Sequence, residues 1–202
     1  CVVNGKIYAI GGVVSVPGAG IRTVEKYDPA TDTWTTEADM PTARHSFGIS
    51  VVNGKIYVIG GTKHCLSPTP LSIVEEYDPL TNTWTRKANM LTARVALSTI
   101  VVNEKIYAIG GAPSYTSRPL SKVEEYDPMT DTWTRKSDMP TAMMMLSTSA
   151  VNERIYVIGG STSGLPGVSV SNVEEYDTRF RETSIGPKGK LATSWGKLKA
   201  GY

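Results

Sequence analysis

Four nearly identical stretches organise this chain: residues 7–12 (IYAIGG), 56–61 (IYVIGG), 106–111 (IYAIGG) and 155–160 (IYVIGG). Their first glycines stand at positions 11, 60, 110 and 159, so the period is 49 to 50 residues. Self-similarity at such a period is the signature of a repeat architecture, in which each unit hides its apolar face against its neighbours. The sequence therefore predicts one domain built from four copies of one unit.

The second copy shows the strands expected in each unit. Residues 46–52 (SFGISVV) carry small and β-branched side chains with no polar face, which is typical of a strand buried on both sides. Asn53 and Gly54 then form a strong hairpin signal, because both central positions of a type I′ turn need positive φ. Further strands are predicted at residues 55–59, 72–77 and 83–87, with the variable segment 62–71 between the second and third strands.

Four short antiparallel strands per unit are typical of the blade of a β-propeller. The Gly-Gly pair, the following Tyr-Asp-Pro, the Trp seven residues after that Tyr, and the run Met-Pro-Thr-Ala-Arg at residues 40–44 resemble the kelch repeat, over residues 1 to about 178. The resemblance implies an all-β, kelch-type propeller of about four blades, at about residues 1–40, 41–90, 91–139 and 140–185, in a complete or an incomplete ring. The residues expected to be structural are Gly11, Gly12, Gly60, Gly61, Gly110, Gly111, Gly159, Gly160, Tyr27, Tyr77, Tyr126, Tyr176, Trp34, Trp84 and Trp133.

The two ends of the chain depart from the repeat. The first copy starts within its innermost strand, and the fourth has Thr183 where the Trp is expected. Residues 179–202 form a basic tail, with six Lys and Arg side chains against one Glu. We expect this tail to supply a missing, ring-closing strand, with Leu191, Trp195 and Leu198 as its apolar side chains. Closure as four blades, self-association through open ring edges, and an isolated open fragment are the three alternatives.

Composition and motifs argue against several classes of function. A net charge of +2 predicts no strongly charged partner, so we expect no nucleic acid, and no apolar run is long enough to span a membrane. His64 and Cys65 are adjacent, which is not metal-ligand spacing, and we expect no metal and no cofactor. Because no nucleophile-base motif or phosphate-binding loop is present, we expect no catalytic residues. The repeated double Glu, as at Glu75-Glu76, is interpreted as a charged strand near the blade edge that resists pairing with other chains.

Binding is the function class that the resemblance favours. In partner-binding kelch propellers the residues just after the repeated Arg face one mouth of the channel, and this implies a ligand-binding site at His45, Ser46, Val95, Ala96, Met144 and Met145. Arg44 and Arg94 themselves are expected to be structural, and Met143 replaces them in the third connection.

The expected function is a non-catalytic scaffold for protein or peptide partners. One alternative is a sugar-active or carbohydrate-binding propeller of the bacterial kelch-like type, which requires a carboxylate and an Arg at the channel mouth. The other is a structural repeat fragment that self-associates as a homodimer.

Overall fold

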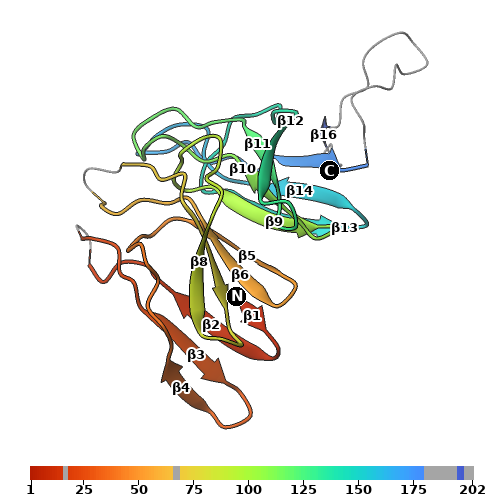
Figure 1. Ribbon diagram of the computed structural model, residues 1–202. Helices are drawn as coiled ribbons and strands as arrows, with labels where there is room; N and C mark the ends of the chain where they lie inside the picture. Colours follow the sequence, from red (N-terminus) through yellow and green to blue (C-terminus); the bar gives the residue numbers. More distant parts are fainter. Residues whose placement is uncertain (16–17, 66–68, 180–194, 198–202) are drawn as a thin grey trace.

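The computed structural model describes residues 1–15, 18–65, 69–179 and 195–197, and these form four antiparallel sheets of four strands each (Figure 1). The first sheet contains β1 (Val2–Val3), β2 (Lys6–Ile10), β3 (Val24–Asp28) and β4 (Thr33–Thr36), paired in that order. The other sheets repeat this order with β5 (Gly48–Val52), β6 (Lys55–Ile59), β7 (Val74–Asp78) and β8 (Thr83–Lys87); β9 (Ser98–Val102), β10 (Lys105–Ile109), β11 (Val123–Asp127) and β12 (Thr132–Lys136); and β13 (Ser147–Val151), β14 (Arg154–Ile158), β15 (Val173–Asp177) and β16 (Trp195–Lys197).

The local turn chemistry is that expected from the sequence. Asn53 and Gly54 have φ values of 50° and 74°, so they form the tight hairpin between β5 and β6. The innermost strand is shorter than predicted because it begins at Gly48 rather than at Ser46, whose φ of 54° is incompatible with an extended strand. The third strand, β7, begins at Val74, two residues later than predicted.

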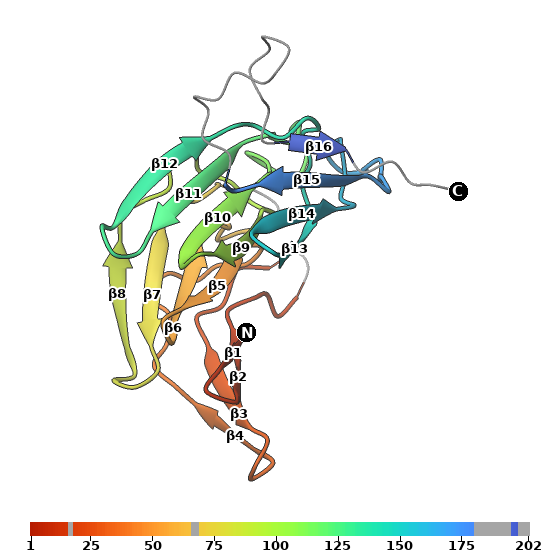
Figure 2. The ribbon, with the colours of Figure 1, turned by 90° about the vertical axis from the view of Figure 1, so that its right-hand side faces the viewer.

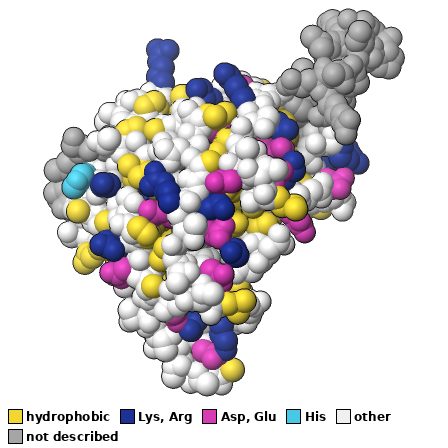
Figure 3. All heavy atoms as spheres, in the orientation of Figure 1, with side chains coloured by type: hydrophobic (Ala, Val, Ile, Leu, Met, Phe, Trp, Pro, Cys, Tyr) yellow, Lys and Arg dark blue, Asp and Glu magenta, His cyan; other side chains and the backbone are white. Residues whose placement is uncertain are grey.

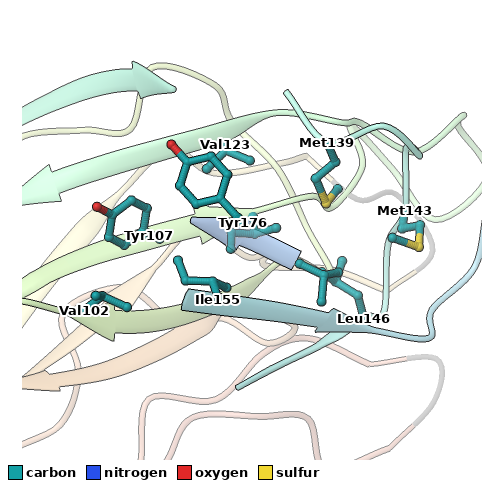
Figure 4. Packing of buried hydrophobic residues seen from close by; sticks show 10 residues of the cluster. Val102, Tyr107, Val123, Met139, Met143, Leu146, Ile155 and Tyr176 are labelled. Atoms are coloured by element: carbon teal, nitrogen blue, oxygen red, sulfur yellow. The ribbon is translucent and has the colours of Figure 1, made fainter. Parts of the chain in front are cut away.

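The sheets follow one another along an arc, with the first and fourth sheets at its two ends (Figure 2). Three apolar clusters join neighbouring sheets, and each combines one face of a sheet with the opposite face of the next. The cluster between the third and fourth sheets contains Val102, Tyr107, Val123, Ile155 and Tyr176 (Figure 4). Within the described residues no such cluster joins the fourth sheet to the first, so the four blades form an incomplete ring.

One aromatic contact recurs at every junction between sheets. A Tyr on the second strand of one sheet meets a Tyr on the third strand of the next, with ring centroids 6.0 Å apart for Tyr8 and Tyr77, and 5.9 Å apart for Tyr57 and Tyr126. The adjacent Trp84 donates its indole N–H to the carbonyl of Ala38 in the preceding connection, at 2.9 Å. Aromatic side chains therefore fill the space between blades, as the repeat pattern predicted.

The C-terminal tail contributes the outermost strand of the fourth sheet. Strand β16 pairs with β15, and the Trp195 ring lies 4.9 Å from the ring of Tyr176. The Trp195 indole N–H donates to the carbonyl of Ser137 at 2.9 Å, as Trp84 and Trp133 donate to Ala38 and Ala88 in their own junctions. Trp195 thus takes the place of the Trp that the fourth repeat lacks, whereas Leu191 and Leu198 lie outside the described residues.

Candidate functional site

Backbone hydrogen bonds join three of the six predicted binding residues into one row across neighbouring sheets. Ser46, Ala96 and Met145 precede the innermost strands β5, β9 and β13, and each has a φ of 54°. The N–H of Ala96 donates to the carbonyl of Ser46, and the N–H of Met145 donates to the carbonyl of Ala96, both at 2.9 Å. We call Ser46, Ala96 and Met145 the loop row. Positive φ is uncommon outside glycine, so the structure specifies this backbone conformation at three equivalent positions.

The residue before each member of the loop row is held inside the protein. His45, Val95 and Met144 make paired backbone hydrogen bonds with Thr62, Ala112 and Ser161, the residues that follow the second, third and fourth Gly-Gly pairs. A Cβ on Gly61 would lie 2.6 Å from the His45 carbonyl oxygen, closer than atoms can approach. The second glycine of the pair is therefore required for the close approach of these two segments.

Burial separates the predicted site residues into two groups. Val95 and Met144 have no exposed surface, and His45 and Ala96 are 5% and 8% exposed. Ser46 is exposed, and Met145 is 47% exposed. Of the six predicted residues, only Ser46 and Met145 offer side chains to a ligand without rearrangement, while the others support them.

A polar cluster at one end of the loop row includes two residues that the sequence did not single out as ligand-binding. The Tyr115 hydroxyl donates to Ser46 Oγ at 2.6 Å and lies 3.2 Å from His45 Nδ1. Cys65 Sγ lies 3.4 Å from His45 Nε2. Burial lowers the pKa of His45, and the nearby His64 lowers it further, so the His45 imidazole is neutral at neutral pH.

Tyr115 reaches this cluster from the variable loop of the third repeat. Its ring stacks on His45, with ring centroids 6.3 Å apart and an interplanar angle of 8°. The variable loops share no pattern between copies, so nothing in the repeat marked Tyr115. The only available signal was an aromatic residue in a loop otherwise made of small residues, Pro and Arg.

The repeated Arg residues behave as structural residues, as expected. Arg44 has no exposed surface, and its Nη2 lies 2.6 Å from Glu75 Oε2. Its Nη1 also donates to the carbonyls of Gly60 and Ile73 at 3.1 and 2.8 Å. Burial lowers the pKa of Arg44 to about 10, although Glu75 opposes this shift, so the guanidinium stays charged at neutral pH.

The interpretation of the double Glu as a charged edge strand was wrong. Strand β7 lies inside its sheet between β6 and β8, and Glu75 and Glu76 are 2% and 6% exposed. Neighbours on a strand face opposite sides, so Glu75 meets Arg44 while Glu76 lies 2.9 Å from Lys55 Nζ on the other face. The two carboxylates neutralise buried and half-buried cations and do not protect an edge.

The fourth sheet has lost this ion pair. Met143 replaces the Arg and is fully buried, while Glu174 keeps its place with no exposed surface. One carboxylate oxygen, Oε2, accepts the N–H of Thr141 at 3.4 Å, and Oε1 has no hydrogen-bond partner among the described residues. Glu174 is therefore a buried carboxylate that lacks the Arg partner of its counterparts Glu75 and Glu124.

Two other kinds of site, a metal centre and a membrane span, have no candidate among the described residues. No group of three or more His, Cys, Asp or Glu side chains in the described ranges is arranged to hold a metal ion. The described residues include no helix that is long and apolar enough to cross a membrane. Basic and acidic side chains alternate over the face shown in Figure 3 and form no continuous basic stripe there.

The four-stranded sheets, the buried Arg–Glu pairs and the recurring Tyr and Trp contacts define a kelch-repeat β-propeller. Residues 1–185 match the KLHDC2/KLHL20/DRC7 Kelch-repeats domain family. The chain belongs to this family.

Individual relatives match shorter parts of the chain. Kelch-like protein 15 of Danio rerio is 43% identical over 54 residues, covering 24% of this chain and 9% of that protein. The F-box protein AFR of Arabidopsis thaliana is 42% identical over 50 residues, which is 25% of this chain and 13% of the relative. Each of these alignments is about one repeat long.

A solved structure matches nearly the whole chain. The structure of YjhT superposes with a TM-score of 0.76 and 20% sequence identity, over 98% of this chain and 64% of that chain. At this identity the likeness concerns the fold alone. The chain thus spans less than two thirds of YjhT and about a tenth of the curated relatives.

Proposed function

We propose that this protein is a non-catalytic binding scaffold that takes a protein or peptide partner on the surface formed by the loop row and Tyr115. One observation carries the proposal. The main chain places Ser46, Ala96 and Met145 in one continuous row, yet the three side chains differ in chemistry. A fixed backbone with variable side chains suits recognition of a partner, whereas the buried parts of each repeat are nearly identical.

The chemistry of this surface fits a peptide better than a small charged ligand. Met145 offers a flexible, polarizable apolar side chain, and Ser46 with Tyr115 offers hydroxyl groups close by. A partner that matches this surface would place an apolar side chain against Met145 and a polar group near Tyr115. No charged residue belongs to the loop row, so we expect binding to depend weakly on salt.

Selection from a peptide library displayed on phage tests the proposal. Peptides selected on the wild-type protein should bind Met145→Arg at least about tenfold more weakly, because hot-spot side chains carry most of the energy of an interface. The matched control is Met129→Arg, since Met129 is 85% exposed on the hairpin between β11 and β12, away from the loop row. If the two variants bind selected peptides equally, the surface is not the binding site.

The carbohydrate alternative receives less support. It requires a carboxylate and an Arg that converge at the channel mouth, but both Arg–Glu pairs beside the loop row are buried and bonded to main-chain carbonyls. Homodimer formation, the other alternative, is favoured by a specific observation. Apolar side chains at both ends of the arc are exposed, including Ile7 at 40% and Ile158 at 45%. Self-association is therefore the second candidate function.

A further inference from the structure

The first sheet exposes a row of apolar side chains that every other sheet buries. Val2, Ile7, Tyr27 and Trp34 lie directly opposite one another across β1 to β4, so they share one face, which we call the first-sheet face. Val2 and Trp34 are 60% and 55% exposed. In the second sheet the equivalent row contains Ile56, Tyr77 and Trp84, and Ile56 and Tyr77 have no exposed surface.

The fourth sheet exposes the opposite half of the same interface. Val151, Tyr156, Ile158 and Val173 form its outward side, which we call the fourth-sheet face. Val151 is 53% exposed and Ile158 is 45% exposed. The equivalent residues of the second sheet, Val52, Tyr57, Ile59 and Val74, are at most 4% exposed, because the third sheet covers them.

These two faces are the partners that meet at each junction inside the chain. In each junction the residues of the fourth-sheet type pack against the residues of the first-sheet type on the next sheet. Each junction contains one contact between two Tyr rings, with centroids 5.9 to 6.2 Å apart. Among the described residues, Tyr27 on the third strand of the first sheet and Tyr156 on the second strand of the fourth sheet are the two equivalent Tyr residues without such a contact. Shape and chemistry are therefore already matched, since the same surface repeats three times in one structure.

We infer that the fourth-sheet face of one copy binds the first-sheet face of a second copy, in a head-to-tail contact. The inference rests on the proposed self-association and specifies its interface. The contact is heterologous, because the two faces are different surfaces. After a single contact one copy retains a free first-sheet face and the other a free fourth-sheet face, and these two either meet to close a ring or recruit further copies.

The first test is the mass in solution, measured by light scattering after size exclusion over a concentration series. The wild-type mass should rise above the 21.8 kDa of one chain as the concentration increases. Ile7→Glu and Ile158→Glu should each weaken association at least about tenfold, because each places a charge in a contact that must exclude water. Leu80→Glu is the control, since Leu80 is 86% exposed on the hairpin between β7 and β8 and should have no effect.

Mixing the two variants gives the decisive result. An equimolar mixture of Ile7→Glu and Ile158→Glu still contains one intact face of each kind, so it should form a one-to-one complex of twice the single-chain mass. Contact of a face with its own kind predicts instead that one of the two variants associates by itself. That result would overturn the inference.

Two further outcomes would also overturn it. The first is a wild-type mass that stays at one chain over the whole series. The second is a monomeric chain whose free energy of unfolding falls in Ile7→Glu and Ile158→Glu but not in Leu80→Glu. That result would mean that the two faces meet within one chain. Circular dichroism confirms that each variant is folded. Peptide binding by Ile7→Glu, compared with Met145→Arg, separates failure of this contact from failure of the loop-row proposal.

Discussion

Replacing Glu by Gln should have opposite effects at two equivalent positions. Glu75 and Glu174 occupy the same place in their sheets, and both are buried. Glu75 accepts a charged hydrogen bond from Arg44 at 2.6 Å and another from the Thr42 hydroxyl at 2.6 Å. Within the part of the chain that the structure describes, Glu174 has one backbone donor at 3.4 Å and a carboxylate oxygen with no hydrogen-bond partner.

The magnitudes follow from these contacts. Glu75→Gln leaves the Arg44 guanidinium buried without its counter-charge, and breaking a buried ion pair costs about 3 to 5 kcal/mol of unfolding free energy. Gln keeps one oxygen acceptor, so we expect the lower end of that range. Glu174→Gln replaces a buried carboxyl group that lacks the Arg partner of its counterparts, and we expect a gain of about 1 to 3 kcal/mol.

Urea unfolding followed by tryptophan fluorescence measures both changes, because the chain has four Trp residues. The unfolding midpoint should fall for Glu75→Gln and rise for Glu174→Gln. A loss of stability in Glu174→Gln comparable to that in Glu75→Gln would refute the reasoning, since the carboxylate would then be making a favourable contact.

Met143→Arg offers an independent check. An Arg at position 143 should pair with Glu174, as Arg94 does with Glu124 at 3.1 Å. A double-mutant cycle measures the effect of Met143→Arg on the free energy of unfolding twice, once in the wild-type chain and once in the Glu174→Gln chain. We expect Met143→Arg to be more favourable in the wild-type chain, with a coupling energy of about 2 to 3 kcal/mol. A coupling energy near zero would mean that the fourth sheet cannot accommodate the pair.

Three more predictions concern other parts of the chain. Trp195→Ala should remove the packing of β16 on β15 and speed amide hydrogen exchange in residues 173–177, with a loss of about 2 to 4 kcal/mol. Gly110→Ala should lower the free energy of unfolding more than Gly54→Ala, by at least about 1 kcal/mol in urea unfolding, because its Cβ would lie 2.4 Å from the Met143 carbonyl oxygen whereas a Cβ on Gly54 would meet no atom within 4 Å. The pKa of Asp177, lowered to about 2 chiefly by its hydrogen bonds with Arg179, should return toward 3.8 in Arg179→Ala when followed by NMR.

The controls for these predictions come from the chain itself. Trp34→Ala should change monomer stability less than Trp195→Ala, because Trp34 is 55% exposed and contacts Tyr27 in its own sheet. For Asp177 the dependence of stability on pH has the direction expected for a carboxyl group whose pKa is lowered by folding. Its contribution to stability is present above pH 3.8 and is lost as the pH falls toward 2, so Arg179→Ala should flatten only that acidic part of the stability curve.

The sequence predicted the fold well because the decisive signals are local and repeated. Each Asn-Gly or equivalent hairpin, each strand of five residues and each Gly-Gly pair is visible in a short window, and four copies confirm one another. The repeat period also predicted the aromatic packing between sheets. The role of Trp195 could be expected only in outline, since a strand from a divergent tail carries no repeat pattern.

The site was predicted less well, since it depends on which side chains turn inward. The sequence placed His45, Ser46 and their counterparts together, but not the alternation in which the first of each pair is buried. That alternation follows from the positive φ at Ser46, Ala96 and Met145, and no propensity rule assigns such a conformation to Ser, Ala or Met. The partners of Glu75 were also missed, because residues 31 apart in sequence, such as Arg44 and Glu75, meet only in the folded sheet.

The loop row also bears on how this surface can change over evolutionary time. Its geometry is set by amide and carbonyl groups that every residue except proline supplies, so substituting Ser46 or Met145, its two exposed members, leaves the hydrogen bonds between blades in place. Mutations at these positions can therefore alter what the surface recognises with little penalty to folding. Substitutions of Arg44 or Tyr77, by contrast, would be removed by selection for stability. A propeller of this design can acquire new partners one residue at a time.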